Sequence, residues 1–411
     1  MSKKVVIIGG GIIGLSSAYY LLKEGHKVTV IDQSDISSGA SFVNAGYISP
    51  SHVIPLAAPG MVSSGIKMMF NQASPFYLKP RFDLDLFKWM WLFNKSATKK
   101  HVKYAAPVIK DLTIFSRDLF QDMKNSSIFD FQFERKGLLM AYQTSKFEDK
   151  EASIAEVSKE QGIKVTHINK GKLKEMEPEM KAEGAFYYLS DAHTTPDDFM
   201  KKIHRYLELN GVKFCTNEKV LDFECISNKI THVITDKQQY HFDEFVIATG
   251  SWSPLIAKKL DVKMLVQAGK GYRINLHRNT GINYPAILAE LNTAVSPMDG
   301  FTRFGGTMEI GRVNTTINKI RVKQIAENAK SFYPNITITK EEMEDAACGL
   351  RPVSPDGLPF IGRIKKYSNA CFATGHAMMG WSQGHATGKL ISEIISEKKP
   401  SLNLTPFSVE R

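Results

Sequence analysis

The feature that most constrains this chain is a glycine-rich turn near its start, between an apolar run and a helical pattern. Residues 5–8 are continuously apolar, which is typical of a parallel strand covered on both faces. Residues 9–14 follow with the spacing GxGxxG, and apolar residues then recur at helical spacing over 12–22. Gly25 ends that helix, and 27–32 form a second apolar run. This pattern predicts a strand, a helix and a second, parallel strand.

Each glycine of the turn suits a dinucleotide site. Gly9 permits a tight turn, the missing side chain of Gly11 lets a pyrophosphate approach the backbone, and Gly14 lets the helix pack on the strand. The phosphates would meet free N–H groups at the helix N-terminus. Asp32 suits a ribose hydroxyl and argues against the 2′-phosphate of NADP. The predicted cofactor contacts here are Gly9, Gly11, Ile12, Ile13, Gly14, Asp32 and Gln33.

The remaining chain predicts further α/β structure and a β-rich region. Its 411 residues, of which 43% are hydrophobic and 23% charged, fit two or three globular units. A helix is expected to begin at Pro196, with Thr195 as N-cap and Gly211 as its stop. Strands are expected at 263–266, 272–276, 286–288 and 308–313.

Beyond the first turn, several short motifs follow one another in one order. They are SFVNAG at 41–46 followed by Ser49-Pro50, ATGSWSP at 248–254, KGY at 270–272, GGTME at 305–309, GLRPVSPDGLPFIG at 349–362 and GHAMMGW at 375–381. Together they resemble the FAD-dependent D-amino-acid oxidase superfamily, most closely its bacterial D-amino-acid dehydrogenases of the small-subunit type. The resemblance covers nearly the full chain, so it is far more specific than one glycine-rich turn.

This resemblance implies an α/β (α+β) fold, in which a Rossmann-like FAD-binding domain carries an inserted, mainly antiparallel β-sheet substrate domain. The FAD-binding domain is expected to be discontinuous and to comprise residues 1–60, 145–255 and 340–411. The substrate-binding domain is expected to comprise residues 61–144 and 256–339. Some relatives bind FAD covalently through a cysteine near the C-terminal motif. Gly349 stands at that place here, with Cys348 one residue earlier, so non-covalent FAD is expected.

The resemblance also implies site residues. Arg351 of the GLRP motif is expected to bind the substrate carboxylate, because a planar guanidinium takes both oxygens in a fork. Tyr272 would donate to that carboxylate or line the pocket, and is alternatively a packing residue. His52 and His376 complete the predicted catalytic set, and a lone histidine such as His52 is alternatively structural. Further cofactor contacts are expected at Ser41, Asn44, Ala45, Gly46, Val220, Ala248, Gly250, Trp252, Gly375, Met378, Met379, Gly380 and Trp381.

The chemistry implied is oxidation of an amine carbon to an imine, which water hydrolyses to a 2-oxo acid and ammonia. The substrate would be a small amino or imino acid. The electrons would pass to a quinone, a redox protein or O2, and not to NAD. Two alternatives stay open: dehydrogenation of a cyclic imino acid such as D-proline or cis-4-hydroxy-D-proline, and a glycine- or sarcosine-type oxidase. No dedicated general base is evident.

The net charge of +11 favours anionic ligands, an anionic membrane surface or nucleic acid. No run of five or more Lys/Arg and no RNA-binding motif occurs, so a flavin-dependent RNA-modification protein is a remote alternative and no nucleic-acid partner is expected. The stretch 76–99 mixes Trp, Phe, Lys and Arg, which fits either peripheral membrane contact or a packed core.

Cysteine usage bears on location and on metals. The four cysteines are Cys215, Cys225, Cys348 and Cys371, and no pair of them has CxxC spacing. We expect them to be reduced and buried, which favours a cytoplasmic location, with peripheral contact at the inner face of the cell membrane as an option. Without clustered Cys and His, no metal site is expected.

Overall fold

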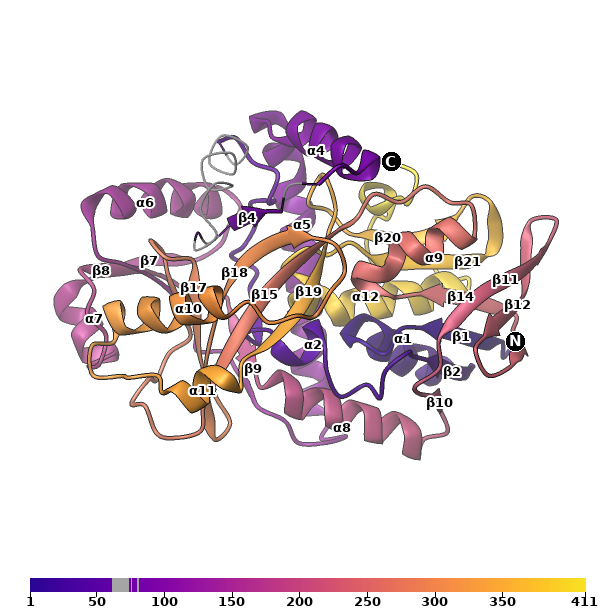
Figure 1. The fold of residues 1–411 in the computed structure, drawn as a ribbon, viewed down its shortest axis with the longest axis horizontal. Coiled ribbons are helices and arrows are strands. Elements are labelled where there is room, and N and C mark those ends of the chain that lie inside the picture. Colours follow the sequence, from indigo (N-terminus) through magenta and orange to yellow (C-terminus); the bar gives the residue numbers. More distant parts are fainter. Residues whose placement is uncertain (61–73, 75, 80) are drawn as a thin grey trace.

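The computed structural model describes residues 1–60, 74, 76–79 and 81–411. In this part of the chain the strands form two large sheets and two small ones, with helices packed around them (Figure 1). The predicted mixed α/β fold is confirmed. The expected substrate segment that starts at 61 and the aromatic stretch 76–99 lie partly outside the described residues.

The first large sheet contains the N-terminal strand. In the described residues its six strands run in the order β10 (Lys213–Cys215), β2 (Lys27–Ile31), β1 (Lys4–Ile8), β14 (Glu244–Ile247), β21 (Tyr367–Thr374) and β20 (Phe360–Ile364). Neighbouring strands are parallel except β20 and β21. Val5, Val6 and Ile7 are fully buried because both faces of β1 are covered, which explains the apolar run at 5–8.

Two helices meet on one face of this sheet, α1 (Ile12–Lys23) and α12 (Gly380–Ile395). Glycines allow their close approach: a Cβ at Gly388 would lie 2.4 Å from the carbonyl carbon of Ser16, and one at Gly384 would lie 2.7 Å from Cγ1 of Ile12. This packing brings the N-terminal end of α12 beside the glycine-rich turn.

Further elements cover the same sheet. Helices α8 (Pro196–Leu209) and α5 (Lys99–Asn125) pack into the core formed by α1 and α12, and α8 begins at Pro196 as predicted. The opposite face carries α9 (Ser253–Lys259) and a small sheet of β11 (Val220–Ile226), β12 (Lys229–Thr235) and β13 (Gln239–His241).

The second large sheet is mainly antiparallel. Its order in the described residues is β19 (Ala347–Val353), β15 (Gln267–Leu276), β18 (Phe301–Gly311), β17 (Thr293–Met298), β16 (Ala286–Leu288), β6 (Leu138–Tyr142), β8 (Gly184–Tyr188) and β7 (Val165–Asn169), and β4 (Phe76–Leu78) pairs with β18. Only the β16–β6 and β18–β4 pairs are parallel among these strands. The edge strand β19 of this second sheet adjoins the first sheet: Val353, at the end of β19, forms an isolated antiparallel bridge with His376, which follows β21.

The domain ranges stay a prediction, and β7, β8 and β19 of the second sheet fall within the ranges predicted for the FAD-binding domain. The structure differs from the sequence-based expectations in two places. The predicted strand at 263–266 is wrong: β15 begins at Gln267, and Met264 and Val266 are buried in the core near α9 without pairing in a sheet. The cysteines are all free as expected, but among them only Cys371 is buried.

The other described elements surround these sheets. They are α2 (Ala40–Val43), α4 (Leu84–Ser96), α6 (Ser145–Glu160), α7 (Lys170–Met176), α10 (Lys319–Phe332), α11 (Lys340–Glu344), the short turns η1 (Gly250–Trp252) and η2 (Thr405–Phe407), and the strands β3 (Tyr47–Ile48), β5 (Phe133–Glu134) and β9 (Ala192–Thr194). Within the described ranges, no helix combines the length and the apolar character needed to cross a bilayer.

Candidate active site

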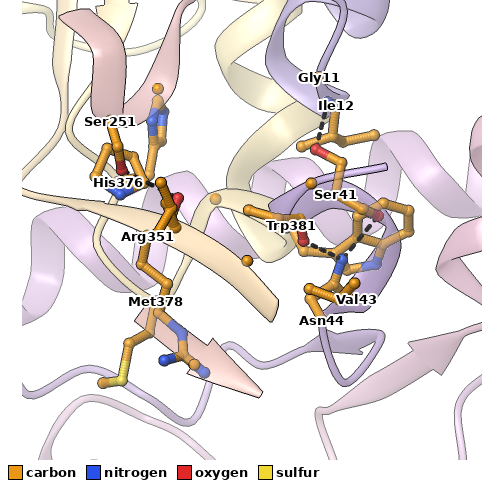
Figure 2. A pocket seen from close by; sticks show the side chains of 18 of the residues that line it. Gly11, Ile12, Ser41, Val43, Asn44, Ser251, Arg351, His376, Met378 and Trp381 are labelled. Carbon is orange, nitrogen blue, oxygen red and sulfur yellow. Dashed lines mark hydrogen bonds between the residues drawn. The ribbon is translucent and has the colours of Figure 1, made fainter. Parts of the chain in front are cut away.

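A cavity of about 1790 Å³ is lined by residues of both large sheets. Most of the predicted site residues line it, and they are Gly9, Gly11, Ile12, Ile13, Asp32, Gln33, Ser41, Asn44, Ala45, His52, Val220, Ala248, Gly250, Trp252, Tyr272, Arg351, His376, Met378, Met379, Gly380 and Trp381. Figure 2 shows Gly11, Ile12 and Ser41 on one side of this pocket and Arg351, His376 and Met378 on the other.

Three predicted residues support the cavity from behind and do not line it. A Cβ at Gly14 would lie 1.9 Å from the carbonyl oxygen of Gly9, so only glycine lets α1 start this close to β1. A Cβ at Gly46 would lie 2.1 Å from the carbonyl oxygen of Thr194. Gly375 packs in the same way against the ring of Phe360.

The glycine-rich end offers backbone donors. Gly11 is the N-cap of α1 and supplies no side-chain cap, and the N–H of Ile12 donates to Oγ of Ser41 at 2.9 Å. The Asp32 carboxylate accepts the N–H of Gly10 at 2.7 Å, which fixes the acid beside the turn. A helix N-terminus whose N-cap residue has no side chain, a close-packed glycine cradle and a held carboxylate are what a pyrophosphate and a ribose require. The residues present therefore fit a dinucleotide.

Sequence reasoning missed Arg303, which joins the second sheet to the loop at 41–46. Its side chain is 1% exposed, and Nη1 donates to the carbonyl oxygens of Phe42 at 2.9 Å and Asn44 at 2.7 Å. Nε donates to Oδ1 of Asn275 at 2.9 Å. Burial lowers the pKa of Arg303 to about 10, so the guanidinium stays charged near neutral pH. No sequence motif marks this arginine.

The N-terminal end of α12 forms another part of the wall. Met379 and Gly380 line the cavity, and Met379, the N-cap, supplies no side-chain cap. The N–H of Ala377 donates to the carbonyl oxygen of Pro352 at 2.8 Å, which ties this loop to the strand that carries Arg351. Because the first N–H groups of a helix carry partial positive charge, this wall favours negative charge in the cavity.

Arg351 is the main cationic feature of the second sheet within the cavity. Its Nη1 donates to the carbonyl oxygen of Thr307 at 2.8 Å, and no carboxylate of the described chain forms an ion pair with it. The guanidinium lies over Gly271, where a Cβ would be 2.3 Å from Nη1. Burial lowers the pKa of Arg351 to about 10, because no neighbouring acid compensates for lost hydration. An anionic ligand would supply that compensation.

A β-bulge shapes the surroundings of Arg351. The pairing of β15 with β18 shifts between Lys270, opposite Glu309, and Tyr272, opposite Gly306. Thr307 lies in this bulge with a φ of 63°, which costs a β-branched residue about 1–3 kcal/mol. The bulge turns the carbonyl of Thr307 toward Arg351. The predicted strand at 308–313 begins just after Thr307, and the sequence does not indicate the bulge.

The hydroxyl of Tyr272 is engaged elsewhere. It donates to Oε2 of Glu309 at 3.2 Å, and the same oxygen lies 3.4 Å from Nε of the buried Arg321. Burial and the nearby Glu309 raise the pKa of Tyr272. Tyr272 also lines the cavity, which agrees with a packing role. Its hydroxyl already has an acceptor in Glu309.

Both predicted histidines line the cavity and are neutral near pH 7. Nε2 of His376 lies 2.9 Å from Oγ1 of Thr387, and burial lowers the pKa of His376 to about 3. Nδ1 of His52 lies 3.2 Å from Oγ of Ser51, and burial lowers the pKa of His52 to about 4. Each therefore offers a polar neutral ring and no positive charge to a ligand.

The family model described as "DAO: FAD dependent oxidoreductase" matches residues 4–394. The chain belongs to this family. It is 32% identical over 400 residues to a D-amino acid dehydrogenase of Helicobacter pylori. The match covers 96% of this chain and 95% of the dehydrogenase. A D-amino acid dehydrogenase of Granulibacter bethesdensis is 27% identical over 420 residues and covers 99% of each chain.

Solved structures share the fold. Glycine oxidase from Bacillus cereus has a TM-score of 0.77 at 22% identity, and the match covers 100% of this chain and 99% of the oxidase chain. L-proline dehydrogenase from P. horikoshii has a TM-score of 0.75 at 20% identity, with coverages of 100% and 97%. The cofactor of this DAO-family enzyme is FAD, which the glycine cradle and the helix N-termini fit. Among the described side chains, no group of three His, Cys, Asp or Glu could hold a metal ion.

Proposed function

We propose that this DAO-family enzyme oxidises D-amino acids to 2-oxo acids and delivers the electrons to an acceptor other than NAD. The observation that carries the proposal is Arg351, a buried guanidinium in the cavity that no carboxylate of the described chain neutralises. A substrate carboxylate would occupy its free N–H groups in a fork and so fix the α-carbon. The names of the relatives from H. pylori and G. bethesdensis support D-amino acids as the substrate class.

The roles of the chain follow from its geometry. FAD supplies the two-electron acceptor when it is bound. The glycine turn and Asp32 hold the nucleotide, and the N-terminal end of α12 beside them favours negative charge in the cavity. Arg303 fixes the loop at 41–46, and Arg351 orients the substrate. Orientation of the reacting carbon is the protein's main contribution to such a reaction.

The surroundings of Cys348 support non-covalent FAD. Cys348 lines the cavity, but its Sγ donates to the carbonyl oxygen of Thr315 at 3.2 Å. Burial raises the pKa of the thiol, which keeps it protonated and a poor nucleophile. Acid precipitation of the yellow protein should leave the flavin in the supernatant; a yellow pellet would show a covalent bond.

The experiment that tests the proposed function is anaerobic reduction of the purified yellow enzyme by a panel of D- and L-amino acids, D-proline, cis-4-hydroxy-D-proline, glycine and sarcosine. Loss of the flavin colour with acyclic D-amino acids, faster than with their L-enantiomers, is the expected result. Colour loss with the cyclic imino acids alone, or with glycine and sarcosine alone, would replace the proposal by one of those activities. No colour loss with any amino or imino acid would overturn it.

We also propose that α4 contacts an anionic membrane surface, which would bring the enzyme to a quinone acceptor. One face of α4 is buried through Leu86, Trp89 and Phe93. Nε1 of Trp89 donates to the carbonyl oxygen of Val353, two residues from Arg351. This face anchors α4 to the site, and Figure 1 shows the helix at the edge of the molecule.

The outer face of α4 and its flanks are apolar and basic. The large exposed apolar side chains are Phe82 at 98%, Leu84 at 77%, Phe87 at 49% and Trp91 at 63% exposure. The exposed lysines are Lys88, Lys95, Lys99, Lys100 and Lys103. Apolar side chains beside clustered lysines match the acyl boundary and the anionic headgroups of a bilayer.

Sedimentation with vesicles of phosphatidylcholine and phosphatidylserine tests this contact. The enzyme should sediment at low salt and lose binding at high salt, because exposed charges are screened. The double variant Phe87→Ser/Trp91→Ser should bind less, whereas Leu209→Ser, at a 75% exposed leucine on α8, should bind like the wild type. No sedimentation at low salt, or equal binding by the double variant, would exclude this surface.

A further inference from the structure

We propose that Asp191, Ser51 and His52 form a proton relay that takes the amine proton of the substrate from the cavity to a buried carboxylate. The inference rests on the proposed function and deepens it, because an amino acid enters the site mainly as an ammonium ion. Only the neutral amine has the nitrogen lone pair that forms the C=N bond. The sequence alone had suggested no general base for this step.

The hydrogen-bond chain has a defined direction. Oγ of Ser51 donates to Oδ2 of Asp191 at 2.5 Å, and the N–H of Ser51 donates to Oδ1 at 3.1 Å. The same Ser51 oxygen lies 3.2 Å from Nδ1 of His52. A hydroxyl has one proton, so Oγ gives it to Asp191 and accepts the Nδ1–H of His52. Nε2 of His52 is then unprotonated, on a ring that lines the cavity.

Asp191 is a buried carboxylate without a cation. It is 0% exposed, and in the described part of the chain no Lys, Arg or His forms an ion pair with it. Its partners are hydroxyl and backbone donors: both donors of Ser51, and Oγ of Ser190 at 3.1 Å. A buried carboxylate without a neighbouring cation is costly to keep charged, so it takes up a proton more readily than an exposed one.

Other charged groups near Asp191 do not change this conclusion. Arg117 of α5 uses Nη1 for the carbonyl oxygen of Ser190 and pairs with Asp118. Tyr188 of β8 has a raised pKa, caused mainly by burial and in part by Asp191 and by Glu151 of α6. Lys150 of α6 lines the cavity and lies 3.8 Å from Glu151.

The two titrating ends of the relay have the right order. Burial raises the pKa of Asp191 to about 7, although its hydroxyl and backbone donors oppose the shift. Burial lowers the pKa of His52 to about 4. A proton that reaches His52 is therefore more stable on Asp191, so His52 and Ser51 conduct it and Asp191 holds it.

The segment that carries His52 contacts both the start of α12 and the strands around Arg351. The N–H of Ser49 donates to Oγ of Ser382, at the start of α12. Leu56 packs in a cluster with Met308, Val353 and Ala377, which are sequence neighbours of Thr307, Pro352 and His376. Both ends of the segment 49–57 therefore contact the elements that hold Arg351 and the α12 loop.

The proposed transfer balances. One ammonium N–H bond of the substrate breaks and its proton joins Nε2 of His52. The Nδ1 proton of His52 passes to Oγ of Ser51, and the hydroxyl proton of Ser51 passes to Oδ2 of Asp191. No electrons leave the substrate in this step. The neutral amine that results can form the C=N bond when the α-hydrogen leaves with its electron pair. Asp191 afterwards returns its proton through Ser51 and His52 to water in the cavity.

Three matched variants test the relay by activity. Ser51→Ala and Asp191→Asn should lower kcat by about 10²-fold at neutral pH and change KM little, because general base catalysis contributes about 10²–10⁴-fold. The defect should shrink as the pH rises and the substrate amine loses its proton to water. Ser190→Ala removes a donor to Asp191 but leaves the chain to His52 intact, so its rate at neutral pH should fall far less than that of Ser51→Ala. Its pH profile should move to higher pH, because the hydrogen bond that is lost lowers the pKa of Asp191 in the wild type.

A spectroscopic readout needs no turnover. In the ¹⁵N-histidine-labelled holoenzyme, the His52 signal, identified by its absence in His52→Gln, should show the proton on Nδ1; in Ser51→Ala it should shift toward the Nε2–H tautomer. A wild-type His52 protonated on Nε2, or a Ser51→Ala enzyme as fast as Ser190→Ala at neutral pH, would overturn the relay. Failure of the whole amino-acid panel would overturn the proposed function instead, and the tautomer would still decide whether this hydrogen-bond chain exists.

Discussion

The nucleotide end of the cavity and its substrate end differ in which part of the polypeptide meets the ligand. At the nucleotide end the phosphate turn and the acid beside it come from one βαβ unit, in which backbone N–H groups and the absence of side chains make room for the ligand. At the substrate end, one buried guanidinium is positioned by residues of β15, β18 and β19 that are far apart in sequence. A local motif is enough for the first, whereas the second requires correct strand pairing.

The largest effect expected is loss of FAD in Gly14→Ala. The added Cβ would lie 1.9 Å from the carbonyl oxygen of Gly9, which is backbone and cannot move without displacing the turn. We expect purified protein with little or no flavin, measured by the ratio of flavin to protein absorbance. Gly171→Ala in α7 is the matched control, since its Cβ would meet only Oδ1 of Asn169 at 3.6 Å. A normally yellow Gly14→Ala enzyme would refute the close-packed turn.

At the substrate end, Arg351→Ala should leave FAD in place and raise KM by about 30-fold to several thousand-fold. The range corresponds to about 2–5 kcal/mol for removing one partner of a buried charge pair. Steady-state kinetics with the best D-amino acid of the panel measure it. Arg351→Lys should recover only part of the loss, because an ammonium group lacks the planar fork. An unchanged KM in Arg351→Ala would remove the carboxylate role.

The next effect concerns the glycine under the guanidinium. In Gly271→Ala the new Cβ would lie 2.3 Å from Nη1 of Arg351, so the side chain must shift. A displacement of about 1 Å can cost up to about 10²-fold, and we expect a rise in KM of up to that size. Gly305→Ala is the control, because its Cβ would meet the carbonyl oxygen of Tyr272 at an ordinary 3.5 Å.

A double-mutant cycle sharpens this prediction. If Gly271 acts only by leaving room for Arg351, Gly271→Ala should add almost nothing in an Arg351→Ala background. Additive effects would mean that the methyl group disturbs the cavity in another way, for example through the ring of Tyr272.

The same contrast explains what could be predicted from the sequence. The turn at 9–14, the strands beside it and the start of α8 at Pro196 depend on neighbouring residues, and the structure has them where the patterns indicate. The strand predicted at 263–266 is wrong because burial in a core and pairing in a sheet select the same residue types, here Met264 and Val266.

Features that depend on long-range packing left no signal in the sequence. The hydrogen bond between Ser51 and Asp191 joins residues 140 positions apart. Arg303 reaches Asn44 over 259 positions. The bulge at Thr307 arises only when β18 pairs with β15. The GLRP motif predicts Arg351 as the carboxylate anchor, but no motif predicts that Thr307 and Gly271 position it.

The smallest effect expected is that of Tyr272→Phe, which asks whether the tyrosine hydroxyl belongs to the substrate end at all. The hydroxyl already donates to Glu309, 3.2 Å away, so KM should stay within about threefold while Arg351 remains in place. Thermal unfolding should show a loss of about 1–3 kcal/mol, because the buried Glu309 carboxylate loses a donor. A KM increase comparable to that of Arg351→Ala would mean that the hydroxyl turns from Glu309 to the substrate carboxylate, and the substrate end would then have two anchors.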